Sequence, residues 1–326
     1  MVSPVLQRSD SAPAPLGRSR LHRHTVLTND GVALSVSDSR PTGAIEHTVV
    51  LLHGLCLTRK SWYRPARHLR GRPGLRVIAY DHRGHGRSGR APLHTYTLDR
   101  LAEDLADVLT ALNVTSPVTF AGHSMGGMTA LSYLARPLTA QPIHPQGLVL
   151  VATSAGQLTD HGLGRLLAVP GLDAAINVVH HLPQMVSERV MHAVARPVCD
   201  IVTHDKTVSA SLAEAFRSTS TSTALGFLHS LKTYDRHHIL PTISAATTVI
   251  SGGTDLLTPP VHSDAMAAAI AGARRIHLHE AGHMLLHEAA TVVSDAIVRT
   301  LAVGRVAASP EATTNGPQLY AIAAPA

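Results

Sequence analysis

The hydrophobic pattern of the chain alternates between short apolar runs and longer stretches with helical spacing. The short runs are rich in β-branched residues and predict eight strands, at residues 24–27, 33–36, 47–52, 76–80, 118–121, 147–151, 247–250 and 274–279. The runs at 49–52 and 148–151 are apolar at every position. This continuous apolarity is expected of central strands that are buried on both faces.

Helical spacing follows several of these strands. It is clearest at 97–112, where Leu101, Leu105 and Val108 lie on one stripe, and it predicts further helices at 125–135, 260–271 and 284–301. Strands separated by helices of this length predict right-handed crossovers and parallel pairing. The expected fold class is therefore α/β, with a mostly parallel eight-stranded sheet that carries helices on both faces.

The strand pattern stops between residues 155 and 236, after the sixth predicted strand. An insertion at this point of a parallel sheet lies above the carboxyl ends of the strands, where ligands bind in open α/β sheets. We therefore expect a helical cap at 155–236 over a core formed by 21–154 and 237–304, with a packed surface excursion as the alternative. The ends, 1–20 and 305–326, are rich in Ser, Ala and Pro and are expected to be disordered tails.

Composition and charge exclude several classes of protein. A hydrophobic content of 44% is too high for a disordered chain. The net charge of +6 is compatible with peripheral contact to an anionic lipid surface, but scattered basic residues and 3% aromatic residues argue against a nucleic-acid partner. No apolar stretch reaches the roughly 18 residues of a membrane span, and residues 1–20 lack the apolar centre of a signal peptide, so a cytoplasmic location is expected. Cys56 and Cys199 are expected to be reduced thiols.

Residues 118–127 contain the pattern Gly-x-Ser-x-Gly between a predicted strand and a predicted helix. The pattern alone is weak, because Gly and Ser are common. A sharp turn from a buried strand into a helix, however, leaves room only for glycine on either side of the central residue, Ser124, and presents its hydroxyl above the sheet. The amide of Met125 would then lie beside an anion that forms on a substrate. A solvated serine in a turn of small residues is the alternative.

A serine hydroxyl is a poor nucleophile unless a histidine, oriented by a carboxylate, accepts its proton. Asp255 follows the predicted strand 247–250, and His283 follows the strand that ends at His279. Both would face the same edge of the sheet as Ser124, in the order Ser, Asp, His that is typical of this architecture. Ordinary turn positions are the alternatives for both residues. Asp235 is a second candidate acid, but it lies at the end of the expected cap.

The motifs together resemble those of the α/β-hydrolase fold superfamily, and in particular its esterase-like and lipase-like members with a serine nucleophile. They occur in the family's order, as His53-Gly54-Leu55, Asp81 to Ser88, Gly122 to Gly127, Gly253-Thr254-Asp255 and Gly282-His283. The resemblance implies that Ser124 is the nucleophile, His283 the base and Asp255 its orienting acid. It also implies that the backbone amides of Leu55 and Met125 form the oxyanion hole, that the Asp81–Ser88 loop is structural, and that no cofactor or metal ion is required.

The expected activity is cleavage of a small carboxylic ester through an acyl-enzyme. Apolar positions of the expected cap suit a hydrophobic substrate group; they are Leu163, Leu166, Leu167, Val169 and Leu172. Cofactor-free perhydrolases similar to haloperoxidases, lactonases and C–C bond hydrolases use a similar triad, and a small-ligand receptor of the same fold is a non-enzymatic alternative. Family members that open epoxides or remove halides carry Asp where this chain has Ser124, so the resemblance does not imply these two activities for this chain. The sequence does not indicate the oligomeric state.

A rival pattern overlaps the candidate base. Residues 279–283 read His-Glu-x-x-His, which in zinc proteases places two metal-binding histidines on one helix face. The residues before it alternate as a strand, and Gly282 is a poor residue for a helix interior. We therefore expect no zinc site here, and we expect ordinary structural roles for the other histidines, such as those at 180, 181, 237, 238 and 277.

Overall fold

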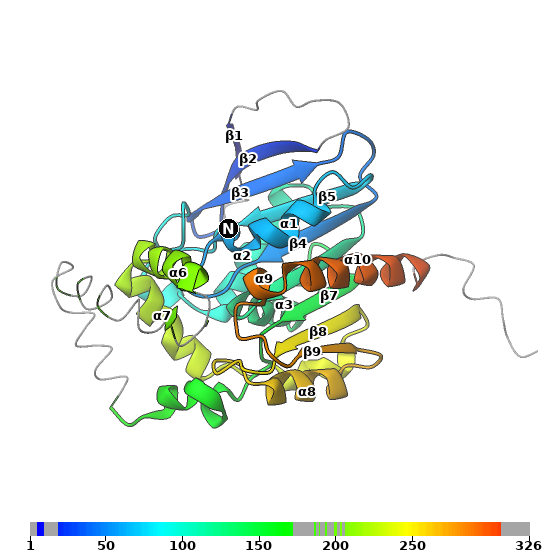
Figure 1. Cartoon of the computed structure of the whole chain (residues 1–326). Helices are drawn as coiled ribbons and strands as arrows, with labels where there is room; N and C mark the ends of the chain where they lie inside the picture. Colours follow the sequence, from blue (N-terminus) through cyan, green and yellow to red (C-terminus); the bar gives the residue numbers. More distant parts are fainter. Residues whose placement is uncertain are drawn as a thin grey trace, which may run out of the picture.

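The computed structural model describes residues 5–9, 19–171 and 206–307, together with positions 186, 189, 193, 199, 200 and 203. These residues form one nine-stranded sheet between helices, in the order β1-β2-β3-β5-β4-β6-β7-β8-β9 (Figure 1). The strands are β1 (Val5–Ser9), β2 (Arg20–Leu27), β3 (Ala33–Arg40), β4 (His47–Leu52), β5 (Leu75–Tyr80), β6 (Val118–His123), β7 (Gly147–Val151), β8 (Ala246–Gly252) and β9 (Arg274–Leu278).

Strands β4 to β9 pair in parallel, whereas β1, β2 and β3 are antiparallel to their neighbours. The mostly parallel α/β sheet predicted from the sequence is confirmed, and all eight expected strands are present. The additional strand, β1, lies inside the segment expected to be a disordered tail. It pairs with β2 from Val5 opposite Leu27, so the backbone groups along that edge of β2 find partners.

Helices cover both faces of the sheet. The α-helices of the described residues are α1 (Tyr63–Leu69), α2 (Leu98–Ala111), α3 (Met125–Leu134), α6 (Lys206–Ser218), α7 (Thr221–Lys232), α8 (Pro260–Ala269), α9 (Leu285–Glu288) and α10 (Ala290–Ala307). Residues of α2, α3 and α8 pack into the hydrophobic core on one face, and residues of α1, α9 and α10 pack into the core on the other. The single helix expected at 284–301 is two helices, because Ala289 leaves the helical conformation with φ −136°.

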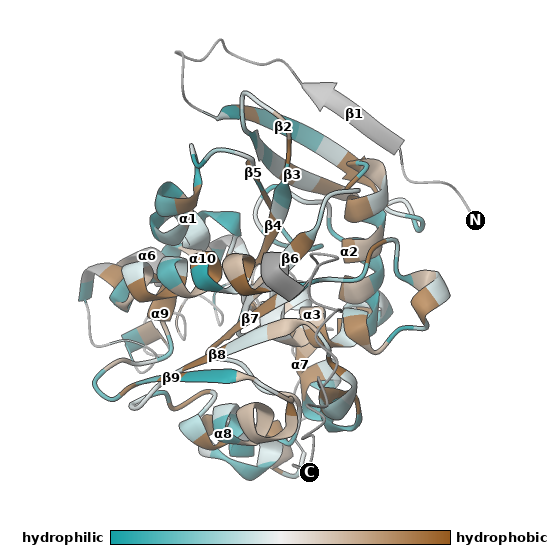
Figure 2. Cartoon of the chain, turned by 90° about the vertical axis from the view of Figure 1, so that its right-hand side faces the viewer, coloured by the Kyte–Doolittle hydropathy of each residue, from teal (hydrophilic) through white to brown (hydrophobic). Residues whose placement is uncertain are grey.

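Burial follows the strand order. The central strands β4, β6 and β7 are buried at every position, while the edge strand β9 is half exposed and mostly hydrophilic (Figure 2). Central strands buried on both faces explain the continuous apolar runs in the sequence. No helix in the described part of the chain is long and apolar enough to cross a bilayer.

The segment between β7 and β8 contains helices and, among its described residues, one isolated antiparallel bridge between Gly156 and Asp235. It contains the 3-10 helices η4 (Leu158–Asp160) and η5 (Gly162–Ala168), followed by α6 and α7, and η6 (His237–Thr242) leads into β8. In Figure 1, α6 and α7 lie together at one end of the sheet. Shorter 3-10 helices elsewhere are η1 (Arg59–Trp62), η2 (Leu93–Thr95) and η3 (Leu138–Ala140).

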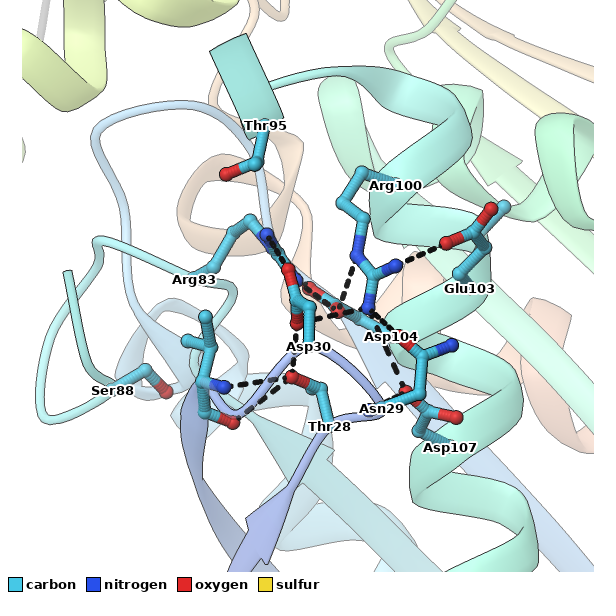
Figure 3. Close-up of polar contacts among 12 residues, drawn as sticks. Thr28, Asn29, Asp30, Arg83, Ser88, Thr95, Arg100, Glu103, Asp104 and Asp107 are labelled. Atoms are coloured by element: carbon cyan, nitrogen blue, oxygen red, sulfur yellow. Dashed lines mark hydrogen bonds and ion pairs between the residues drawn. The ribbon is translucent and has the colours of Figure 1, made fainter. Parts of the chain in front are cut away.

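A network of ion pairs fastens the loop after β5 to α2 (Figure 3). The side chain of Arg83 has no exposed surface and donates to both oxygens of Asp104, at 2.8 and 2.7 Å, and to both oxygens of Asp30, at 3.0 Å each. Arg100 pairs with Asp30 and with Glu103. The network fixes the backbone of the loop after β5.

Candidate active site

Ser124 lies in the turn between β6 and α3 in a strained backbone conformation. Its φ of 52° and ψ of −123° are rarely adopted by residues with a side chain. Two contacts hold this geometry: the Ser124 amide donates to the Val151 carbonyl at 2.9 Å, and the Thr153 hydroxyl donates to the Ser124 carbonyl at 2.7 Å. Strain that persists because neighbours fix it is typical of functional sites.

The glycines on either side of Ser124 make the turn possible. A Cβ atom on Gly122 would lie 2.4 Å from the Gly127 nitrogen, and one on Gly126 would lie 2.2 Å from the Leu52 carbonyl oxygen. Both distances are far inside van der Waals contact with backbone atoms, which cannot give way. The structure therefore supports the steric argument made from the Gly-x-Ser-x-Gly pattern.

Asp255 and His283 form a buried pair at the carboxyl ends of β8 and β9. The distance from His283 Nδ1 to Asp255 Oδ2 is 2.8 Å, and the two residues are 4% and 2% exposed. Asp255 Oδ1 accepts the amides of Leu257 and Thr258, at 2.8 and 2.9 Å, and the Thr258 hydroxyl donates to Oδ2 at 2.8 Å. Because Nδ1–H donates to the carboxylate, Nε2 of the neutral ring carries the lone pair that a base needs.

The carboxylate of Asp255 stays ionised despite its burial. Burial would raise the pKa of Asp255, but attraction to His283, the hydrogen bond from His283 and the two from Thr258 outweigh it and lower the pKa. An ionised carboxylate next to Nδ1 can stabilise an imidazolium that forms during a reaction. Thr258, which sequence reasoning missed, stands three residues after the acid, and its amide closes a local turn on the carboxylate.

His123, the variable residue before Ser124, supports the base. Its Nε2–H donates to the backbone carbonyl of His283 at 2.9 Å, and the ring is fully buried. Burial, together with the nearby His283, lowers the pKa of His123 to about 3, so the ring is neutral at physiological pH. Nothing in the sequence signals this role, because the motif leaves the position open.

The two predicted oxyanion donors, the amides of Leu55 and Met125, belong to residues that line the same cavity as Ser124 and His283. No hydrogen bond within the described residues occupies either amide. A Cβ atom on Gly54 would lie 3.1 Å from the Ser124 Cβ, so the Leu55 loop packs closely against the nucleophile turn. Two unoccupied amides beside a serine could stabilise a developing negative charge.

The cavity has a volume of about 380 Å³ and an apolar wall. Residues of η4, η5, α6 and α7 supply the part of the wall that faces the sheet; they are Leu158, Leu163, Gly164, Leu167, Phe216, Ala224, Leu225, Leu228 and Leu231. The described lining contains no Lys, Arg, Asp or Glu. Of the apolar positions singled out in the sequence, Leu166 and Val169 are exposed instead, and Leu172 lies outside the described residues.

The remaining sequence candidates lie elsewhere. Asp235, the second candidate acid, is half exposed and pairs with His237 at 3.0 Å. His283 is hydrogen-bonded to Asp255 instead. Residues 279–283 are not helical, which separates His279 from the helix face that a zinc-protease motif requires. The described residues contain no group of three or more His, Cys, Asp or Glu suited to a metal ion.

The two cysteines and the remaining histidines of the sequence analysis have the following positions. Cys56 and Cys199 form no disulfide, and both line the cavity. Burial raises the pKa of the Cys56 thiol to about 12, so this thiol is not the activated nucleophile. His277 has a structural partner, since Nδ1 lies 2.9 Å from the Ser251 hydroxyl. The histidines at 180 and 181 lie outside the described residues.

Comparison with known proteins agrees with the observed fold. Residues 47–290 match the family model described as alpha/beta hydrolase fold. The chain is 35% identical over 113 residues to 3-oxoadipate enol-lactonase 1 of Acinetobacter baylyi, and 36% identical over 128 residues to a non-heme chloroperoxidase of Streptomyces lividans. These matches cover 35% and 39% of the chain but only 40% and 44% of the relatives' length. The solved esterase EaEST of Exiguobacterium antarcticum superposes with a TM-score of 0.70 over 85% of this chain and 98% of the esterase, at 22% identity.

Proposed function

Because the chain belongs to the alpha/beta hydrolase fold family, we propose that it cleaves a carboxylic ester, with Ser124 as nucleophile, His283 as base and Asp255 as orienting acid. One observation carries the proposal: His283, which is hydrogen-bonded to the buried Asp255, lines the same cavity as the strained Ser124. A nucleophile and a base that line one cavity, with an acid hydrogen-bonded to the base, are the set that acyl transfer requires.

The proposed reaction has two halves. The Ser124 oxygen attacks the ester carbonyl while His283 takes its proton, and the amides of Leu55 and Met125 stabilise the oxyanion. His283 then gives the proton to the departing alcohol, which leaves the acyl group on Ser124. Water, deprotonated by His283, attacks this acyl-enzyme, and His283 returns the proton to the Ser124 oxygen as the acid is released. Asp255 stabilises the imidazolium in both halves, and water is the only reactant besides the ester.

The cavity wall points to the class of ester. The wall is apolar, and none of its described residues is Lys, Arg, Asp or Glu. Such a wall favours a neutral substrate with a hydrophobic acyl group, since burying an unpaired carboxylate costs several kcal/mol. A substrate with a free carboxylate, as the name 3-oxoadipate enol-lactone implies, would find no cationic partner among the described lining residues. A neutral lactone is the second candidate, because similarity to a lactonase favours it and the same steps would open its ring.

A matched pair of esters tests this class. We expect kcat/KM for p-nitrophenyl butyrate to exceed that for the p-nitrophenyl monoester of succinate by about 100-fold, because both acyl groups contain four carbons and only the second brings a carboxylate into an apolar cavity. The measurement is the release of p-nitrophenol. The same assay, run from acetate to palmitate, measures how much acyl chain the cavity takes. Equal rates for butyrate and succinate would refute the neutral-substrate assignment.

The pH profile tests the base. We expect kcat/KM for p-nitrophenyl butyrate to fall toward acid pH by tenfold per pH unit, because one proton on His283 removes the base while Asp255, with its lowered pKa, stays ionised. Rates measured between about pH 4.5 and 8.5 give the slope. A rate that does not change over this range, or a fall of a hundredfold per unit, would contradict a single titrating base.

A further inference from the structure

The turn that carries Leu55 is held by a hydrogen bond to a residue of another loop, His85. Cys56 has a φ of 57°, a left-handed conformation that residues with a side chain rarely adopt. Within the turn, the Leu57 amide donates to the Gly54 carbonyl at 3.2 Å. A second contact comes from the loop after β5, where His85 Nε2 accepts the Cys56 amide at 3.1 Å. His85 thus fixes the residue next to the proposed oxyanion donor.

His85 is locked as a hydrogen-bond acceptor. Its Nδ1–H donates to the Arg83 carbonyl at 3.0 Å, which leaves the lone pair on Nε2 for the Cys56 amide. The ring is fully buried, and this burial, with the nearby His53, lowers the pKa of His85 to about 3. The ring therefore stays neutral at physiological pH. The Arg83 backbone is itself anchored, because the Arg83 side chain is held by Asp104 (Figure 3).

His85 also contacts the helix α7, which lines the cavity. The His85 ring lies 5.9 Å from the ring of Phe227, a fully buried residue of α7. A Cβ atom on Gly84 would lie 2.4 Å from the Thr223 hydroxyl oxygen, so α7 packs directly on the loop that carries His85. The same helix presents Leu225 and Leu228 to the cavity. His85 consequently contacts both the helix whose residues would contact an acyl group and the turn that would hold its oxyanion.

We propose that His85 is a positioning residue: by accepting the Cys56 amide it keeps the Leu55 amide at the cavity, and Phe227 holds its ring in place from α7. The inference rests on the proposed function, because it takes Leu55 as an oxyanion donor. His85 itself is absent from the described lining of the cavity, so its effect passes through the turn. A displaced donor stabilises the transition state less without changing how the neutral ester binds.

Substitution of His85 separates the acceptor from the shape of the side chain. We expect His85→Leu to lower kcat by about 10- to 100-fold with KM changed less than about twofold, somewhat less than the loss of a whole oxyanion donor. His85→Gln should restore most of kcat, because its amide oxygen can accept where Nε2 did. His94→Leu is the control: His94 is exposed on the same loop, and this variant should match the wild type. Melting curves of all variants report folding.

A fluorophosphonate separates this inference from the proposed function. In that reaction the Ser124 oxygen bonds to phosphorus, fluoride leaves, and His283 takes the hydroxyl proton. The labelling rate reports the oxyanion donors without any ester, and it should fall in His85→Leu by the same 10- to 100-fold. A folded His85→Leu protein with wild-type kcat and labelling rate overturns the role of His85 and leaves the function standing. A wild-type protein that neither hydrolyses esters nor becomes labelled overturns both.

A second variant covers the case in which His85→Leu does not fold. Phe227→Leu keeps an apolar side chain in α7 but removes the ring that backs His85. We expect it to lower kcat and the labelling rate by about three- to tenfold with KM unchanged, because the acceptor remains but is less firmly placed. Wild-type values for both rates would overturn the proposal.

Discussion

Replacing Ser124 by Ala is expected to lower kcat for p-nitrophenyl butyrate by about 10⁴- to 10⁶-fold, since the variant lacks the hydroxyl that would form the acyl-enzyme. Alanine accepts the same backbone strain as serine, and the turn is held by Val151 and Thr153 through the backbone of residue 124, so the fold should survive. The residual rate would come from the oxyanion amides. Steady-state rates with enough enzyme to detect a millionfold loss provide the measurement.

Two controls make this result specific. Ser132→Ala changes a buried serine of α3 whose hydroxyl has no partner within the described residues, and it should keep wild-type activity. Glu280→Gln and a chelator test the rival zinc motif, in which Glu280 would activate water. A Ser124→Ala enzyme that keeps a tenth of the activity, or an activity that vanishes with the chelator and with Glu280→Gln, would remove Ser124 from the mechanism.

The parts of the fold that the sequence predicted are those with a local physical signature. The buried strands β4 and β7 are apolar at every position because both faces are covered, and this leaves a continuous run that can be read from the sequence. Helix α2 was predicted from its apolar stripe, and its start at Thr97 is a side-chain cap that accepts the Arg100 amide. Each signal lies within one segment.

The features that escaped prediction depend on contacts between distant segments. Strand β1 exists because the edge of β2 offers unpaired backbone groups, and a five-residue strand within a Ser- and Pro-rich segment has too weak a pattern to be recognised. The break between α9 and α10 occurs at Ala289, which carries neither a glycine nor a proline signal. The contact from His85 to Cys56 joins two loops, and only the folded sheet brings them together.

The residues of the candidate site also fall into those that the sequence predicted and those that it did not. Ser124, Asp255 and His283 were predicted because each follows a strand, and the parallel sheet brings those strand ends to one edge. The residues that orient them, such as His123 and Thr258, have no pattern of their own. Their roles follow from hydrogen bonds that only the three-dimensional structure supplies.

The largest effect on stability is expected at Asp104, which faces the buried guanidinium of Arg83. Asp104→Ala should lower the free energy of unfolding by about 3–5 kcal/mol. The variant leaves the Arg83 guanidinium buried, with the partly exposed Asp30 as its remaining partner among the described residues. Urea denaturation gives the measurement, through a lower midpoint at an unchanged slope.

The neighbouring residue Glu103 is the matched control. Glu103→Ala removes a carboxylate from the same helix, but its side chain is 40% exposed and pairs with Arg100, so the loss should stay below about 1 kcal/mol. Asp104→Asn should fall between the two, since it keeps an acceptor for Arg83 and loses the charge. Equal midpoints for Asp104→Ala and Glu103→Ala would show that the buried pair contributes no more than an exposed one. Among the described ion pairs, Arg83 has Asp104 and Asp30 as its partners (Figure 3). If the Asp104 pair contributes little, contacts other than these ion pairs must hold the loop that carries His85.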